Sequence, residues 1–360
     1  MTLDAYIKEA LEKGASDIHF AVGRPPTYRI HGELVSAGPR PLTSEETEAL
    51  AKEIITEAHR KRIEEVGGVD FGFSFKDKAR IRVSCFKERG NFGLALRPLP
   101  NRFFSFEEIG LSEKVIELLG LPRGLILVTG PTGSGKTTTL ATMLNYVNEN
   151  FAKHIITIED PIEFMHAHKK SLITQREVGQ DVSDFSEAVV KALRQDPDVI
   201  LIGEMRDLAT MEAAIRAAET GHLVFATLHT SGAARTVDRI IDVFPTHQQA
   251  QVRVQLASIL VAVLSQTLLP KADGTGRVAA FELMVTTPAI RNLIREGKTY
   301  QIFSEIQTGS RMGMKLLDDH LHELYDQGLI SYDAVMQTAY EPKELSEKIV
   351  RGAVGTAKKK

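Results

Sequence analysis

Residues 125–140 read LILVTGPTGSGKTTTL, and this stretch decides the fold. The apolar run at 125–128 predicts a buried strand, and residues 136–149 have the pattern of a helix. Between them lies a complete phosphate-binding P-loop pattern in its proper strand-to-helix context. Its glycines let backbone N–H groups turn inward around an anion, and the helix N-terminus adds partial positive charge. The stretch therefore predicts a nucleotide-binding α/β domain.

The P-loop pattern assigns a role to each part of the loop. Lys136 is expected to reach the β and γ phosphates of ATP, and Thr137 is expected to ligate Mg²⁺. A chance glycine turn before a helix is the alternative, and the flanking strand and helix argue against it. The predicted nucleotide-binding positions are Gly130, Pro131, Thr132, Gly133, Ser134, Gly135, Lys136, Thr137 and Thr138.

Downstream of residue 110, short apolar strands alternate with helical patterns at 184–195 and 207–220. Continuous apolar strands between helices predict a parallel sheet covered on both faces, with its ligands at the carboxyl ends of the strands. The run LASILVAVLSQTLL at 256–269 is interpreted as a buried helix, because a bilayer span needs about 20 apolar residues. After residue 232 the chain is predicted to be mostly helical, apart from a strand at 277–285.

Acidic residues follow two of these strands. HIITIED ends at Glu159 and Asp160, with Glu163 three residues further on, and DVILIGE ends at Glu204. We expect Glu163 and Glu204 at the sheet edge where the P-loop opens, one organising the Mg²⁺ shell and the other polarising the attacking water. Glu163 is predicted as the general base and Glu204 as the metal-side acid. The alternative is that one of them only forms an ion pair with a neighbour such as Arg206.

Two histidines flank the next strand, in GHLVFATLHTSG. His229 at its end is placed to sense the γ-phosphate or an acid beside it. His222 lies at its start. A histidine at a strand end is also a common structural hydrogen-bonding residue, which is the alternative for both.

Residues 1–100 have the pattern of a separate α/β domain. Alternating apolar residues between 71 and 96 predict a half-buried antiparallel sheet, and residues 98–105, with Pro98, Pro100 and Asn101, are the best linker candidate. Arg80, Arg82 and Arg97 alternate with the apolar residues and are expected on the outer face. They form either a solvated or nucleic-acid-binding basic face, or arginine fingers that complete the phosphate site of another subunit.

Composition excludes several other classes of protein. The net charge of −3 over 360 residues gives no bulk attraction to nucleic acid or anionic membrane. Cys85 is the single cysteine, so one chain cannot build a disulfide framework or a multi-cysteine zinc site. The N-terminal segment has acidic residues near its start and no long apolar core, so it does not resemble a signal peptide.

Four motifs together resemble the type II/IV secretion ATPase superfamily. GPTGSGKTTTL resembles its Walker A motif, IITIEDPIEF its Asp box, LRQDPDVILIGEMRD its Walker B motif and TGHLVFATLHTSGA its His box, and GASDIHF near the start resembles its N-terminal domain. The resemblance covers about residues 1–340. It implies a PAS-like N-terminal domain (1–100), a linker (101–110), a RecA-like P-loop ATPase domain (111–290) and a C-terminal helical region (291–360).

The same resemblance implies a homohexameric ring that hydrolyses ATP with Mg²⁺. It implies that Glu163 and Glu204 are the catalytic acids, with Mg²⁺ held at Thr137 and, partly through water, at Glu204. His222 and His229 match the His box. Arg82 and Arg97 fall at positions that resemble inter-subunit arginines, and Arg80 matches less well.

Within the superfamily the chain resembles the ATPases that retract type IV pili. These members share a helix motif with AIRNLIRE at 289–296, whereas extension and secretion ATPases usually carry a further N-terminal domain and often a four-cysteine zinc insert. The resemblance implies a cytoplasmic motor, peripheral at the inner face of the membrane, that acts on pilin through an inner-membrane platform protein. The alternatives are an extension or secretion ATPase and a nucleic-acid-translocating RecA-like motor.

Overall fold

The computed structural model describes residues 2–76, 79–99 and 102–357. It divides into two units: one comprises Met1–Arg102, Asp160–His166 and Glu177–Asp181, and the other comprises the rest of the chain. Of the predicted linker residues, Pro100 and Asn101 lie outside the described residues. No helix within the described part of the chain is long and apolar enough to cross a membrane.

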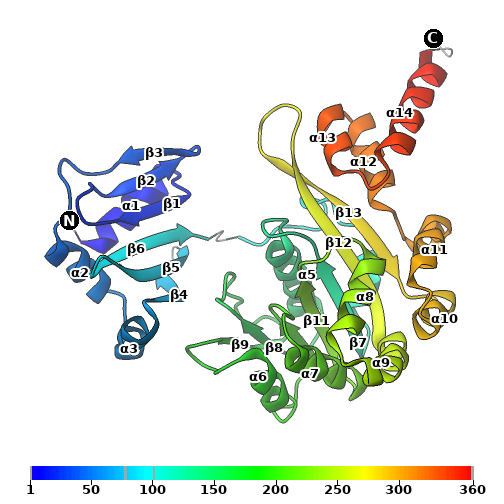
Figure 1. Ribbon diagram of the computed structural model, residues 1–360, viewed down its shortest axis with the longest axis horizontal. Coiled ribbons are helices and arrows are strands. Elements are labelled where there is room, and N and C mark those ends of the chain that lie inside the picture. Colours follow the sequence, from blue (N-terminus) through cyan, green and yellow to red (C-terminus); the bar gives the residue numbers. More distant parts are fainter. Residues whose placement is uncertain (1, 77–78, 100–101, 358–360) are drawn as a thin grey trace. The chain divides into compact units, whose positions relative to one another are not determined.

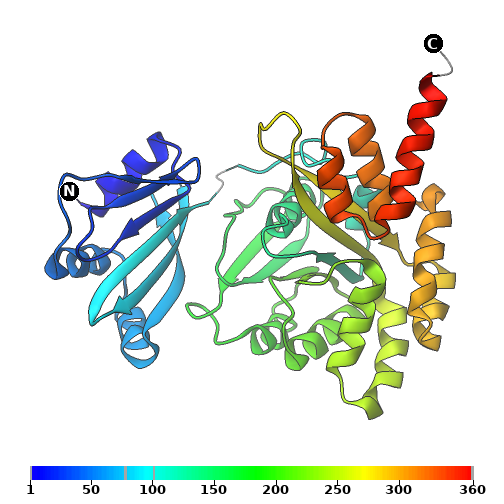
Figure 2. The same ribbon diagram turned by 45° about the horizontal axis from the view of Figure 1, so that its top comes forward.

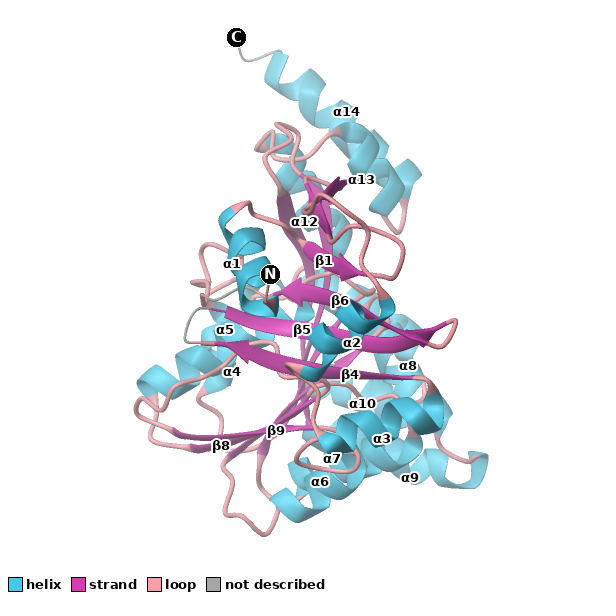
Figure 3. Ribbon diagram, turned by 90° about the vertical axis from the view of Figure 1, so that its left-hand side faces the viewer, coloured by secondary structure: helices cyan, strands magenta, loops and turns pink. Residues whose placement is uncertain are grey.

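A six-stranded sheet forms the centre of the first unit, with strand order β3-β2-β1-β6-β5-β4. Figure 3 shows β1, β6, β5 and β4 in this order. Ile81, Val83 and Cys85 on β5 are fully buried, and they pack with Leu3 and Ile7 of α1. This alternation matches the predicted half-buried antiparallel sheet. The elements are α1 (Leu3–Glu12), β1 (Asp17–Phe20), β2 (Thr27–Ile30), β3 (Glu33–Ser36), α2 (Ser44–Lys52), α3 (Glu57–Val66), β4 (Gly68–Phe75), β5 (Ala79–Glu88) and β6 (Asn91–Pro98).

The second unit is built on a seven-stranded sheet with strand order β13-β12-β7-β11-β10-β8-β9 (Figure 1). The neighbouring strands β12, β7, β11, β10 and β8 are parallel, so their carboxyl ends lie at one edge. The strands are β7 (Gly124–Thr129), β8 (His154–Glu159), β9 (Leu172–Glu177), β10 (Val199–Ile202), β11 (Leu223–Leu228), β12 (Leu260–Pro270) and β13 (Arg277–Val285).

Helices cover this sheet and extend beyond it at the C-terminus. The P-loop helix packs its apolar residues against β7, and α12 packs on β13. Figure 2 shows the C-terminal helices in orange and red. The helices are α4 (Lys114–Leu119), α5 (Lys136–Asn150), α6 (Phe185–Ala192), α7 (Leu208–Glu219), α8 (Ala233–Val243), α9 (Thr246–Ile259), α10 (Pro288–Glu296), α11 (Ile302–Thr308), α12 (Leu317–Asp326), α13 (Tyr332–Thr338) and α14 (Pro342–Ala357), with the short 3₁₀ helices η1 (Thr299–Gln301) and η2 (Ser310–Met312).

The prediction of a helix over 256–269 was wrong. Helix α9 ends at Ile259, and β12 begins at Leu260 and pairs with both β7 and β13. A strand buried on both faces is continuously apolar, so its periodicity does not distinguish it from a buried helix. The β-branched residues Val261 and Val263 inside the run favour the strand.

Candidate active site

The P-loop connects β7 to α5 at the edge where the parallel strands end. Gly130 has φ +140°, and a β-carbon there would lie 2.1 Å from the backbone oxygen of Gln266, so only glycine fits. The side-chain amide of Gln266 donates to the carbonyl of Ser134 at 2.6 Å. Among the described atoms, the buried hydroxyl of Ser134 finds no hydrogen-bond partner, which fits a loop shaped around a ligand.

Lys136, the first residue of α5, lies folded over this loop. Its Nζ donates to the carbonyls of Gly130 at 2.8 Å and Pro131 at 3.1 Å. Burial lowers the pKa of Lys136, and the nearby charge of Glu204 opposes that shift. The ammonium group is therefore held in a low-dielectric site in which an anion would interact with it strongly.

Glu204 and His229 meet beside the P-loop. They follow the neighbouring strands β10 and β11, and Nε2 of His229 lies 3.0 Å from Oε1 of Glu204. Nδ1 of His229 lies 3.4 Å from the hydroxyl of Thr132, inside the P-loop. His229 thus bridges the acid at the end of β10 and the phosphate loop at the end of β7. The sequence prediction placed each of these groups at the edge but did not include the contact with Thr132.

Glu204 makes a second contact that favours its charged form. The guanidinium of Arg206 lies 2.7 Å from its Oε2. Burial raises the pKa of Glu204, but the hydrogen bond from Arg206 and the charges of His229 and Arg206 outweigh burial and hold that pKa below its ordinary value. A hollow of about 320 Å³ opens on Glu204 and His229, and its wall includes Arg239, which the sequence reasoning missed. An arginine within a helix carries no sequence signal for such a position.

His222 occupies the opposite end of β11 from His229. Its Nδ1 lies 2.9 Å from the carbonyl oxygen of Ala217 and 3.2 Å from the hydroxyl of Thr220, where α7 ends. A six-residue strand separates the two histidines, which corresponds to roughly 20 Å. His222 therefore takes part in a helix-end hydrogen-bond group away from the P-loop.

Glu159 is a buried structural acid at the end of β8. It accepts hydrogen bonds from Thr157 at 2.6 Å and Gln175 at 3.2 Å, both on strands of the same sheet. Asp160, the next residue, and Glu163 belong to the first unit. The carboxylate of Glu163 is ion-paired there with Arg82.

The three predicted arginines lie on β5 and β6 of the first unit. Arg82 is directly opposite Arg97 across the two strands, on the face that alternates with the buried residues. Arg97 is paired with Asp17 at 2.7 Å and its side chain is 59% exposed. Arg80 is 13% exposed and bound to Glu177 at 2.7 Å, so it has a structural role in the unit.

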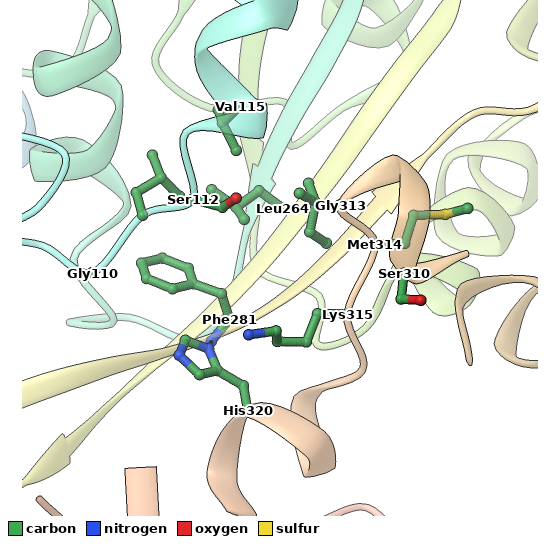
Figure 4. Close-up of a pocket in the computed structure, with 12 residues that line it drawn as sticks. Gly110, Ser112, Val115, Leu264, Phe281, Ser310, Gly313, Met314, Lys315 and His320 are labelled. Carbon is green, nitrogen blue, oxygen red and sulfur yellow. Dashed lines mark hydrogen bonds between the residues drawn. The ribbon is translucent and has the colours of Figure 1, made fainter. Parts of the chain in front are cut away.

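A second hollow in the described part of the second unit contains none of the predicted site residues (Figure 4). It measures about 310 Å³ and lies among β12, β13 and the segment before α12. His320 stacks beside Phe281 on its wall, with ring centres 5.9 Å apart. Its Nδ1 accepts the backbone N–H of Phe281 at 2.9 Å.

Comparison with known proteins shows the family of this chain. The family model described as "Type II/IV secretion system protein" matches residues 1–336. The chain belongs to that family. It is 48% identical to the type IV pilus retraction ATPase PilT of Pseudomonas aeruginosa, over 95% of this chain and 99% of that protein. It is 47% identical to a twitching motility protein of Neisseria gonorrhoeae, over 89% and 86% of the two chains.

A solved structure extends the likeness to the fold. The crystal structure of the pilus retraction motor PilT with bound ADP matches with a TM-score of 0.90 and 49% identity, over 96% of this chain and 99% of that one. The predicted two-domain α/β secretion ATPase fold is confirmed. The predicted ATPase class is confirmed as well, and this secretion-family chain is a nucleotide-binding ATPase.

Proposed function

We propose that this chain is the motor ATPase that powers retraction of type IV pili, acting as a homohexamer in the cytoplasm at the inner face of the membrane. The observation that carries the ATPase part of the proposal is the contact of His229 with both Glu204 and the P-loop residue Thr132. The high identity to a retraction ATPase over almost the whole of both chains favours this branch over the extension and secretion ATPases. An inner-membrane platform protein and, through it, pilin are the expected partners.

Hydrolysis at this site needs an ordered anion and a water molecule. Lys136 binds the β and γ phosphates and exchanges its contacts with the loop carbonyls for contacts with them. Thr137 and, through water, Glu204 would hold Mg²⁺, which neutralises phosphate charge. Among the described residues, no group of three or more His, Cys, Asp or Glu side chains gathers as a metal site, which fits an ion held largely by the nucleotide itself.

The remaining side chains orient the water and respond to the phosphate. His229, which contacts both Glu204 and the loop, responds when the γ-phosphate leaves. Glu163 takes the proton of the attacking water. Its carboxylate is bound to Arg82, so it becomes available when that guanidinium moves to a phosphate. Arg82 and Arg97 act on the site of the neighbouring subunit, where such arginines contribute about 10³–10⁵ in rate.

A subunit-mixing experiment tests the shared site. Lys136→Ala and Arg97→Ala subunits should each be inactive alone. Their mixture should recover ATPase activity, because a site with intact Lys136 can use Arg97 from its neighbour. The matched control mixes Lys136→Ala with Glu204→Gln, whose groups belong to the same site, and this mixture should stay inactive. Equal activity of the two mixtures after confirmed subunit exchange would argue against arginines supplied by the neighbour.

Deletion of the gene in its host tests the direction of the motor. Loss of a retraction ATPase leaves cells with excess surface pili and no twitching movement, whereas loss of an extension ATPase leaves cells without pili. Electron microscopy of the surface and a twitching assay measure both. If the deleted cells lack pili and a plasmid copy of the gene restores the pili, the retraction assignment would be overturned and an extension motor favoured.

A further inference from the structure

The hollow beside Glu204 carries more positive than negative charge. Its wall consists of Glu204, Met205, Arg206, Leu228, His229, Thr230 and Arg239. Among these described residues Glu204 is the single acid, and it is already bound to Arg206 at 2.7 Å and to His229 at 3.0 Å. The guanidinium of Arg239 adds a further positive charge. The wall is therefore suited to an anion, and the volume of about 320 Å³ leaves room for an ion larger than water.

Arg239 lies on helix α8, which has no evident need of its charge. It makes no ion pair or side-chain hydrogen bond with any residue that the structure describes. Asp242 is three positions further along α8, at the spacing of a helical ion pair, yet the two side chains are not paired. Arg235, four positions earlier, is a like charge on the same face, which slightly destabilises a helix. The position of Arg239 on the wall of the hollow therefore points to a role there.

The loop that carries His229 is joined to the same part of α8. The hydroxyls of Thr230 and Thr236 lie 2.7 Å apart, and the hydroxyl of Thr236 donates to the carbonyl of Gly232 at 2.8 Å. Thr230 must then donate the hydrogen between the two hydroxyls, so it has no proton left for an anion. Thr236 is three positions before Arg239, so the two lie on one face of α8.

His229 forms a wall shared by the hollow and the phosphate loop. One of its ring nitrogens contacts Glu204, and the other lies 3.4 Å from the hydroxyl of Thr132 in the P-loop. Hydrolysis of ATP yields ADP, which the P-loop binds, and one orthophosphate ion, which must leave before the next ATP binds. An ion that leaves past His229 meets the guanidiniums of Arg206 and Arg239. Arg206 still has N–H donors beyond those bound to Glu204, because a guanidinium carries five.

We propose that this hollow is a transient binding site for the orthophosphate product and that Arg239 is its main ligand. The inference rests on the ATPase part of the proposed function. A guanidinium offers two parallel N–H donors that match phosphate oxygens, and an exposed site allows the ion to leave again. The same chemistry suits the γ-phosphate of bound ATP, so the experiment has to distinguish these two sources of the phosphate group.

Titration of inorganic phosphate into the assembled full chain, saturated with ADP and Mg²⁺, measures the site without turnover. Phosphorus NMR follows the binding. We expect Arg239→Gln to weaken phosphate binding about tenfold, through the loss of one charge-assisted contact. The affinity for ADP and the KM for ATP should stay within about twofold. Arg235→Gln is the matched control, because its guanidinium lies 5.9 Å from the ring of Tyr340 and outside the hollow, and it should bind phosphate like the parent.

The salt dependence of binding tests whether Arg239 acts through its charge. Added sodium chloride should weaken phosphate binding by the parent more steeply than by Arg239→Gln, because salt screens an exposed charge. Equal salt dependence, phosphate affinity in Arg239→Gln equal to that of the parent, or a parent that binds no phosphate beside ADP would overturn the inference.

Two further outcomes assign Arg239 to a different role. A parallel loss of ATP affinity would place it on the γ-phosphate of bound ATP, and loss of assembly on size-exclusion chromatography with unchanged phosphate affinity would place it in a subunit contact. Either result overturns the inference. A parent that hydrolyses no ATP would overturn the proposed function together with this inference, whereas an active parent with any of the other results would overturn this inference alone.

Discussion

The hydrogen bond between Gln266 and the P-loop offers a direct test of how the fold shapes the nucleotide site. Gln266→Leu keeps most of the side-chain volume and removes the amide that donates to the Ser134 carbonyl at 2.6 Å. A buried carbonyl left without a partner costs about 1–3 kcal/mol. In the free protein the loop can relax and expose this carbonyl to water, but a loop closed around phosphates cannot. The cost therefore falls on nucleotide affinity, which should weaken by about 5- to 150-fold.

Titration with a fluorescent ATP analogue and urea unfolding of the nucleotide-free protein measure the two quantities separately. We expect the larger effect on the dissociation constant and a smaller one on the free energy of unfolding. The control is Gln255→Leu, which removes an exposed hydrogen bond to Glu219 on the helices α9 and α7 and should change neither value appreciably. A variant at 266 that binds nucleotide as tightly as the parent, or that loses only folding stability, would refute this reasoning.

Three further predictions concern the acid, a buried histidine and a strained glycine. Glu204→Gln should lower kcat by about 10²–10⁴ while nucleotide still binds, measured by phosphate release and nucleotide titration; unchanged turnover would remove Glu204 from the chemistry. Burial lowers the pKa of His320, and its Nδ1 accepts the N–H of Phe281, so the folded state resists protonation. In the unfolded chain His320 has an ordinary pKa of about 6.5, so below that pH the unfolded state binds a proton that the folded state resists. The contribution of His320 to stability is therefore complete above about pH 6.5 and is lost as the pH falls below it. Urea unfolding between pH 8 and 5 should show the free energy of unfolding decreasing toward low pH, and His320→Gln should reduce this dependence. Gly232→Ala should destabilise the protein by about 1–3 kcal/mol in the same unfolding assay, because a backbone at φ +91° is strained for alanine and its β-carbon would lie only 3.1 Å from the Tyr340 hydroxyl; an unaltered midpoint would contradict that.

The sequence allowed the phosphate site to be predicted because its signals are local. Residues 130–137 carry the loop, and the ends of two apolar strands place Glu204 and His229 at the same edge. Neither conclusion requires knowledge of distant contacts, since parallel strands align their carboxyl ends. The alternation in β5 and β6 likewise placed Arg82 and Arg97 on one face, and the register sets them directly opposite each other.

Contacts between distant segments could not be predicted in the same way. Gln266 lies in a short polar stretch of an otherwise apolar strand, and its partner Ser134 lies 132 positions away. The helix assigned to 256–269 failed for a related reason, because pairing on both sides of β12 replaces the signal of alternation. Tertiary context decided each of these features.

The arginine pair illustrates how charge separates the proposed motor from a nucleic-acid-binding alternative. Like charges directly opposite each other destabilise a sheet, so Arg82 and Arg97 need compensation. Glu163 and Asp17 supply it, and each guanidinium carries its own carboxylate. Binding to a nucleic-acid backbone depends on cationic side chains that are free to neutralise phosphates along a strand. On this face the two arginines are already paired with carboxylates, so they are poorly suited to that role. A single terminal phosphate with two or more negative charges can instead draw both guanidiniums from their carboxylates at once. In the proposed mechanism both arginines must reach this phosphate, so we expect the exchange only where they are correctly placed, and hydrolysis would then depend on the arrangement of the subunits.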